Sequence, residues 1–394
     1  MFFTCTAASH ENCSHGALSP ASDTAFPQAG SGHGAAGASK PASAARKAGI
    51  ASARGRHLHI DVHCHYQNND VAAMAAPLKP FEREPSIVYA NALTREVNQK
   101  QMRDRAAKLT DIETRLHDMD RMGIDVQVVS PSPSQYYYYA DADFGRQLSR
   151  ATNDRIAQIV AGNPDRFAGM CTVPLQDPGM AARELERCVR KLGMRGVEIC
   201  TNVNGVDLAD KRLGLDRFFA KAEELGVVVF MHPMGFTHAD RMTDYYFNNI
   251  IGNPLESTLA VSHLIFGGVL DRFPGLKFLV AHGGGYLAHY PARMDHGWKA
   301  RPDSHITVKK KPSSYLRKFY YDTITFDPGM LESLVSLYGA RQVMLGSDYP
   351  YDMADDNPVR TIAAARGLDD SQRNLILGGN AARLFGLKKR AAKR

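Results

Sequence analysis

The stretch FAGMCTVPLQDPGMAARELERCVRKLGMRGVEIC, residues 167–200, contains one complete strand–helix–strand unit. Two short apolar runs, FAGMCTVP (167–174) and GVEIC (196–200), flank an amphipathic segment, GMAARELERCVRKLG (179–193). Nearly continuous apolar strands joined by such a helix are typical of parallel strands covered by helices. The helical segment ends in glycine, which readily adopts the left-handed conformation found at helix ends. This unit therefore predicts a parallel α/β fold.

The same unit recurs from residue 57 to residue 387. Further amphipathic segments are ETRLHDMDRMG, LDRFFAKAEELG and LESLVSLYGA. The other predicted strands are HLHIDVH (57–63), DVQVVS (125–130), GVVVFMHP (226–233), KFLVAHGG (277–284), FYYDTIT (319–325) and VMLGSD (343–348). Eight strand–helix units predict a closed (β/α)₈ barrel of the TIM type, which takes roughly 250 residues or more. The alternative, an open doubly wound sheet, lacks the GxGxxG motif that would support it after the first strand.

Segments of low complexity flank the predicted barrel. Residues 1–56 are rich in Ala, Gly and Ser and show no periodicity, so we interpret them as a disordered leader. Residues 388–394, KKRAAKR, form a basic tail. These two segments account for the net charge of +7, because residues 57–387 contain 38 basic and 39 acidic side chains. The charge therefore does not predict a nucleic-acid partner.

Two further features predict the surroundings of the protein. No apolar run approaches the ~18 residues that a transmembrane helix needs, so we expect no membrane partner. None of the six cysteines forms a CxxC pair, and four are spread through the predicted barrel. This pattern is typical of reduced thiols, and we expect a cytoplasmic protein.

Five side chains that can bind a metal lie at the carboxyl ends of predicted strands. The sequence His63-Cys64-His65 ends the first strand, and side chains two apart in an extended chain point to the same side. His232, His282 and Asp348 close the fifth, sixth and eighth strands. Barrel enzymes build their active sites at this rim. Imidazoles together with a carboxylate suit a borderline ion such as zinc, so we predict one divalent metal ion.

Each of these residues also has a structural interpretation. Taken alone, His232 suits a hydrogen bond at the rim, His282 a tight loop and Asp348 a turn. The agreement of several strand ends favours the metal site. A non-catalytic, zinc-stabilised barrel is a further alternative, but the nearest thiol, Cys64, points away from its two histidine neighbours.

The motifs HIDVHCHY, VFMHP, AHGGG, GSDYP and GNAARLFGL resemble those of the metal-dependent amidohydrolase superfamily. They are most similar to the branch that contains 2-amino-3-carboxymuconate-6-semialdehyde decarboxylase, over residues 57–387. The resemblance implies a single zinc ion held by His63, His65, His232 and Asp348. It also implies catalytic roles for His282, beside the metal-bound water, and for Asp348.

The resemblance also bears on substrate binding. It implies that Arg293 and Arg301 contact the carboxylates of a substrate in a neighbouring subunit, and hence a homodimer. A further family arginine has Arg103 and Arg105 as candidates within a divergent segment, 67–109. The fourth strand, GVEIC, lacks the carboxylated lysine of binuclear members, which favours a mononuclear site.

We therefore predict a carboxy-lyase that releases CO₂ without oxidation from an unsaturated small-molecule carboxylate, such as an aromatic ring-cleavage product. No phosphate-binding loop or flavin motif is found, so the substrate itself must accept the electrons. The alternative is a hydrolase or hydratase that uses the same metal site. Two further expectations concern neighbours of the site. Asp322 should lie in the barrel interior or behind the metal ligands, and SPSPSQYYYY (130–139) should either line the substrate or pack against a neighbouring loop.

Overall fold

The computed structural model describes residues 58–288 and 290–387, so the predicted leader and basic tail lie outside the described residues. Eight parallel strands form one sheet in the order β1-β2-β3-β4-β7-β8-β9-β10. They are β1 (Ile60–Tyr66), β2 (Val126–Pro131), β3 (Phe167–Cys171), β4 (Gly196–Cys200), β7 (Val228–His232), β8 (Lys277–Val280), β9 (Tyr320–Asp322) and β10 (Val343–Met344). A short hairpin, β5 (Asn202–Val203) and β6 (Val206–Asp207), follows β4.

The sheet closes on itself between β1 and the chain that follows β10. The backbone N–H of Val62 donates to the carbonyl of Leu345 at 2.9 Å, and that of His65 donates to Tyr349 at 2.8 Å. Cys64 and Tyr349 form a parallel bridge. These bonds join the first and last strands, so the predicted barrel is confirmed and the open sheet is excluded.

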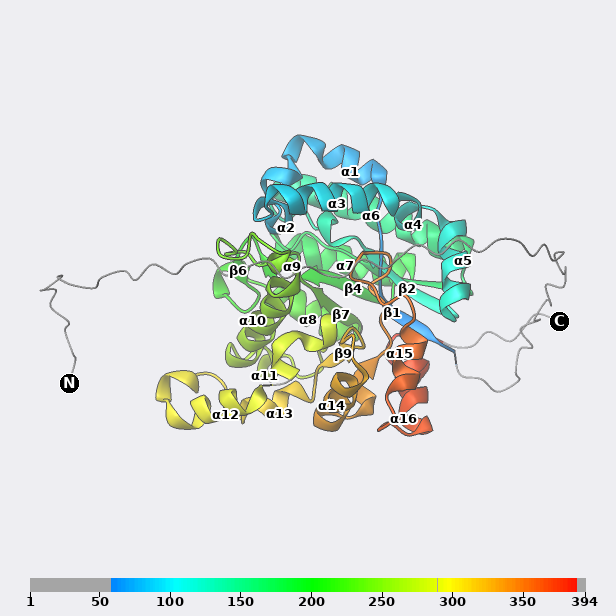
Figure 1. Ribbon diagram of the computed structural model, residues 1–394. Helices are drawn as coiled ribbons and strands as arrows, with labels where there is room; N and C mark the ends of the chain where they lie inside the picture. The colour runs from blue at the N-terminus through cyan, green and yellow to red at the C-terminus, as the bar shows by residue number, and fades with distance from the viewer. Residues whose placement is uncertain (1–57, 289, 388–394) are drawn as a thin grey trace, which may run out of the picture. The chain divides into compact units, whose positions relative to one another are not determined.

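Helices flank the strands (Figure 1). The principal ones are α5 (Ile112–Met122), α6 (Ala142–Gly162), α7 (Pro178–Leu192), α8 (Asp216–Leu225), α10 (Gly252–Phe266) and α14 (Pro328–Tyr338). Shorter ones are α9 (Phe247–Ile250), α11 (Val269–Arg272), α12 (Pro291–Ala300), α13 (Pro312–Leu316), α15 (Pro358–Ala364), α16 (Asp370–Asn374) and α17 (Asn380–Leu384). Gly123, Gly193 and Gly226 end α5, α7 and α8 in the left-handed conformation, as predicted. Within the described residues, no helix is both long and apolar enough to cross a membrane.

The apolar core has two main parts. One fills the barrel interior with strand residues such as Val62, Val128 and Phe230, together with Phe385 after α17. The other packs the outer faces of the strands against the helices. Alternate residues of each strand therefore belong to different apolar layers. Polar side chains of the site lie at the rim of the barrel, beyond these layers.

A helical insertion between β1 and α5 was not predicted. It contains α1 (Asn69–Ala75), α2 (Pro85–Val88), α3 (Ala92–Asp104) and α4 (Ala106–Thr110). The longest of these, α3, has no buried residue. The apolar periodicity that reveals core-facing helices is therefore absent from it, so the sequence pattern does not predict this helix.

Several predicted strand boundaries were wrong. The first strand begins at Ile60 and extends to Tyr66 rather than spanning 57–63. The sixth and eighth strands end at Val280 and Met344, so His282 and Asp348 follow their strands instead of closing them. Both residues have positive φ angles, 57° and 58°, and a left-handed residue cannot continue a strand.

Candidate metal centre

The two histidines of strand β1 point into one site, as their spacing predicts. The rings of His63 and His65 are 5.1 Å apart between centroids, and both side chains are buried. The β1–β2 register shifts between Asp61 and Cys64. Cys64 faces the outer layer, where its thiol donates to the Val128 carbonyl at 3.6 Å. The predicted separation of the thiol from the two imidazoles is therefore confirmed.

Three side chains from later strands complete the cluster. The ring of His232, the last residue of β7, lies 5.0 Å from that of His63 and 4.8 Å from that of His65. The Asp348 carboxylate lies 3.2 Å from Nε2 of His63, 3.3 Å from Nε2 of His65 and 3.5 Å from Nε2 of His282. Single donor atoms of His63, His232, His282 and Asp348 all lie within 4.8 Å of one another. His65 is outside this group of four, but its contact with Asp348 places all five residues in one cluster.

The hydrogen bonds behind the histidines leave nitrogen lone pairs free. Nδ1 of His63 lies 2.6 Å from the Asp322 carboxylate, and Nδ1 of His65 lies 3.0 Å from the Pro131 carbonyl oxygen. Both oxygens accept, so each Nδ1 carries a proton, and in the neutral ring each Nε2 keeps its lone pair for a metal ion. These Nε2 atoms and both ring nitrogens of His232 are buried and have no hydrogen-bond partner among the described residues. Because buried polar atoms are costly to leave unpaired, this donor set fits a divalent metal ion.

Burial and neighbouring charges shift the pKa values of the cluster in opposite directions. Burial would lower the pKa of His63, but the carboxylates of Asp348 and Asp322 outweigh it and raise that pKa to about 10, so a metal ion would replace a proton on this ring. Burial, reinforced by the neighbouring histidines, holds the pKa of His232 well below its usual range. Burial would raise the pKa of Asp348, but the charge of His63 and the close contacts with the surrounding imidazoles outweigh it and lower that pKa strongly. A neutral imidazole and an ionised carboxylate are the forms that bind metals.

Asp322, the last residue of β9, supports the cluster from behind. Its Oδ2 accepts hydrogen bonds from Nδ1 of His63 and from the backbone N–H of His282, the latter at 2.9 Å. Its Oδ1 accepts from the backbone N–H of Gly283 at 2.7 Å. One buried carboxylate thus positions a ring from the first strand and the loop after the sixth. The prediction that Asp322 belongs to the interior near the site is confirmed.

Strand β4 contributes a carboxyl group that the sequence analysis overlooked. Glu198 is fully buried, its Oε2 lies 3.7 Å from Nδ1 of His65, and its Oε1 accepts a hydrogen bond from the Tyr136 hydroxyl at 2.5 Å. Burial raises the pKa of this carboxyl. Its neighbours Val197 and Ile199 pack in the outer layer. Because side chains alternate along a strand, this pattern could have indicated that Glu198 points inward.

A cavity of about 400 Å³ opens at the cluster. His232, His282 and Asp348 contribute to its lining, and much of the rest comes from the insertion 67–109. Among the described residues that line it, Arg105 is the only arginine or lysine. Its guanidinium is held in place by hydrogen bonds to the Pro350 carbonyl and to the Gln101 side chain, both at 2.9 Å.

Most of the other residues predicted to contact the substrate do not line this cavity. Of the four consecutive tyrosines, only Tyr137 lines the cavity, whereas Tyr136 and Tyr138 stack on each other at 5.6 Å in the core. Arg293 is exposed on α12 and does not line the cavity. Arg301 is exposed as well, and it pairs with Asp303 at 2.7 Å. Neither arginine therefore joins the cluster within one chain.

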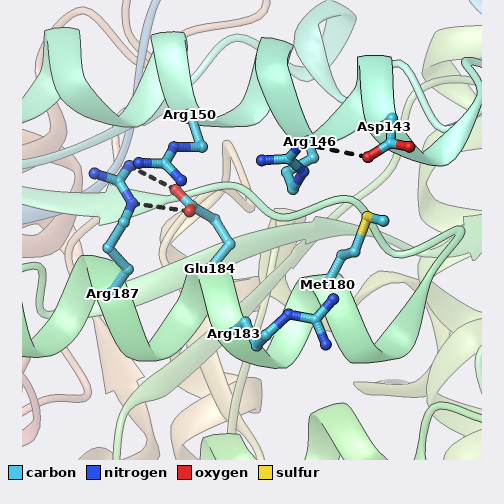
Figure 2. A pocket seen from close by; sticks show the side chains of 7 residues that line it. All are labelled: Asp143, Arg146, Arg150, Met180, Arg183, Glu184 and Arg187. Carbon is cyan, nitrogen blue, oxygen red and sulfur yellow. Dashed lines mark hydrogen bonds and ion pairs between the residues drawn. The ribbon is translucent and has the colours of Figure 1, made fainter.

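A second hollow of about 390 Å³ lies between α6 and α7 (Figure 2). Arginines from both helices line it, but Glu184 and Asp154 bind the guanidinium of Arg187 at 2.7 and 2.8 Å. None of the predicted site residues lines this hollow. The histidine cluster and its cavity are therefore the candidate active site.

A parallel barrel with buried imidazoles and a carboxylate at its carboxyl rim defines a metal-dependent barrel enzyme. Residues 60–387 match the Amidohydrolase family model. The chain belongs to this amidohydrolase family.

Known relatives agree with this assignment. The chain is 37% identical over 278 residues to 2-amino-3-carboxymuconate-6-semialdehyde decarboxylase of Dictyostelium discoideum, covering 70% of this chain and 77% of the relative. The structure of 5-carboxyvanillate decarboxylase from Sphingomonas paucimobilis is similar with a TM-score of 0.75 and 29% identity, covering 84% of this chain and 99% of that one. The corresponding enzyme of Novosphingobium aromaticivorans, solved with manganese and 4-hydroxy-3-methoxy-5-nitrobenzoic acid, has a TM-score of 0.74 and 25% identity, covering 84% and 96%.

Proposed function

We propose that this chain is a metal-dependent, non-oxidative decarboxylase of an unsaturated or aromatic carboxylic acid. One class of substrate is the aromatic ring-cleavage product, similar to 2-amino-3-carboxymuconate semialdehyde. The observation that carries the proposal is the cavity itself, which combines free metal-binding atoms at its base with one guanidinium on its wall. The relatives named above are decarboxylases, which supports the same reaction.

The proposed metal ligands are His63, His65, His232 and Asp348, and the proposed ion is zinc. A divalent ion is supported by the donor set and by the manganese in a similar structure. When bound, such an ion polarises a substrate oxygen and stabilises the negative charge that develops on it.

The side chains of the cavity bind and orient the acid. The guanidinium of Arg105 can hold a carboxylate through paired hydrogen bonds, a geometry that its planar shape favours. Further carboxylate contacts are proposed to come from Arg293 and Arg301 of a neighbouring subunit in a homodimer. A cytoplasmic location is proposed on the basis of the reduced-thiol pattern.

Proton transfer is assigned to His282. Loss of CO₂ leaves an electron pair on the carbon that carried the carboxylate, and a proton must take its place there. The His282 side chain is 14% exposed in the cavity wall, and its Nε2 lies 3.5 Å from Asp348. This position lets the imidazole deliver a proton to the substrate carbon, with Asp348 stabilising the charged ring.

The first test is an absorbance time course with trapped CO₂, using zinc-loaded protein and freshly generated 2-amino-3-carboxymuconate semialdehyde. We expect one CO₂ per substrate consumed. His282→Asn should lower kcat by about 10²–10⁴-fold, while the zinc content stays near that of the wild type. A product that keeps its carboxylate would favour the hydrolase or hydratase reading, and full activity of His282→Asn would refute the role of this histidine.

A mixing experiment tests the role of the remote Arg293. Arg293→Gln and His282→Asn proteins should each be inactive alone. If Arg293 acts in the neighbouring subunit, mixed dimers contain one intact site, and reassociated protein should recover about a quarter of wild-type activity. No recovery would show that Arg293 does not act across a dimer interface.

A further inference from the structure

One buried acid in the wall of the cavity has no role in the proposed mechanism. Glu84 precedes α2 within the insertion, is 3% exposed and lines the cavity. The Tyr139 hydroxyl donates to its Oε1 over a long distance of 3.4 Å. Among the described residues, no lysine or arginine forms an ion pair with this carboxyl group.

The fold does not explain this acid. Glu84 occupies the N-cap position of α2, where a carboxylate often accepts a backbone N–H, but its side chain makes no such bond. A buried carboxyl group with only one long hydrogen bond and no cationic partner costs free energy that an apolar side chain at this position would avoid. Structural stability therefore gives no reason for a glutamate here.

The surroundings of Glu84 favour its neutral form. Tyr137 and Tyr139 lie beside it, and both belong to an apolar cluster with Val71 and Leu148. Burial raises the pKa of the Glu84 carboxyl to about 8, and the bond from Tyr139 only partly opposes this. A neutral carboxyl group can both donate and accept hydrogen bonds, and it does not repel an anionic substrate.

The other charged groups of the cavity are assigned or lie apart. Arg105 is the cation suited to a substrate carboxylate, Asp348 belongs to the metal centre, and Asp352 is exposed. We propose that Glu84 is a specificity-determining residue that binds a hydroxyl or amino group of the substrate. The enzyme would then select acids that carry such a hydrogen-bond donor. The inference rests on the proposed function in taking an organic acid as the ligand.

Binding of unreactive probes tests this without requiring turnover. A nitro group mimics a carboxylate but cannot be lost as CO₂. Calorimetry on zinc-loaded protein would measure the Kd of three probes. 2-Nitrophenol is the reference, 2-nitroresorcinol carries one additional hydroxyl group, and 3-amino-2-nitrophenol carries an additional amino group. We expect the wild type to prefer the probe with the extra donor by about three- to tenfold, the effect of one hydrogen bond. The pair with the larger preference identifies the group that Glu84 binds.

Substitutions then assign the preference to one residue. Glu84→Leu should abolish it, whereas Glu84→Gln should keep it, because the amide still accepts a hydrogen bond. Glu82→Gln is the matched control, since Glu82 lies in the same insertion, is half exposed and does not line the cavity. Glu84→Met serves if the leucine variant does not fold.

Two results would overturn the inference: equal binding of all probes by the wild type, or an unchanged preference in Glu84→Leu or Glu84→Met. Both are separable from failure of the proposed function, which shows as absence of CO₂ release from acids by the wild type.

Discussion

Asp322→Asn should weaken metal binding and the fold together, because this carboxylate serves four buried donors. Oδ2 accepts from His63 and from the backbone of His282, and Oδ1 accepts from the backbones of Gly283 and Ile324 at 2.7 and 3.1 Å. An amide has a single accepting oxygen. Whichever way the amide turns, its NH₂ group faces two buried N–H donors and leaves them without an acceptor. Each unpaired donor lowers the free energy of unfolding by about 1–3 kcal/mol. We therefore expect the free energy of unfolding of the metal-free protein to fall by about 2–6 kcal/mol.

Metal affinity should fall because the ring of His63 loses the carboxylate that fixes its tautomer. Loss of such a partner typically raises the Kd of a metal by about 10–100-fold. The Kd is measured by competition with a chelator, and unfolding by urea titration of the metal-free proteins. Asp327→Asn is the control, because Asp327 is an exposed helix cap and asparagine caps equally well. A zinc Kd of Asp322→Asn within twofold of the wild type would refute the reasoning.

Further predictions concern the cavity, the barrel closure, protonation and the metal. Arg105→Met should raise KM for carboxylate substrates by about 10–100-fold with a smaller change in kcat, and steady-state kinetics checks this; an unchanged KM would contradict the assignment. In Gly346→Ala the added Cβ would lie 2.9 Å from the Cβ atoms of both His63 and Asp322. We therefore expect the free energy of unfolding to fall by about 1–3 kcal/mol and the zinc content to fall as well. Calorimetry and elemental analysis check these two changes. Burial raises the pKa of Glu84 from 4.5 to about 8, so the folded protein loses stability as pH rises through this interval. Glu84→Gln removes that loss, so in urea titrations its free energy of unfolding should exceed that of the wild type by about 3–6 kcal/mol at pH 9, with little difference at pH 4.5. Equal stability at pH 9 would show that the group is not buried as a neutral acid. Zinc at a hundred times its Kd should raise the unfolding free energy by about 2.7 kcal/mol over chelated protein, and a midpoint independent of zinc would argue against the site.

The local pattern of the chain was enough to predict the barrel and the residues of its metal cluster. Apolar strands alternate with amphipathic helices, and each side chain of the cluster lies in or just after a strand. Parallel strands of a barrel meet at one rim, so a position along the strand predicts a position in space. For this reason His63, His65 and His232 could be placed together before their distances were known. The mononuclear zinc site, the homodimer and the boundaries at residues 56 and 387 stay predictions.

Strand ends were less predictable. His282 and Asp348 lie beyond their strands because their backbones adopt positive φ angles. That conformation is imposed by contacts with other strands, such as the bond from the backbone N–H of Asp348 to the His63 carbonyl at 2.8 Å. Apolar runs in the sequence contain no record of such contacts.

Only the tertiary structure decided which polar groups share the cavity. Arg105 and Glu84 come from an insertion whose longest helix has no buried face, so no periodicity indicated that they line the site. Glu198 and Asp322 are paired with residues 62 and 259 positions away. A sequence predicts the hydrophobic periodicity and the local backbone geometry, because both depend on residues that are close together in the chain. The partner of a buried charge depends on how distant segments pack, and that information exists only once the barrel has closed.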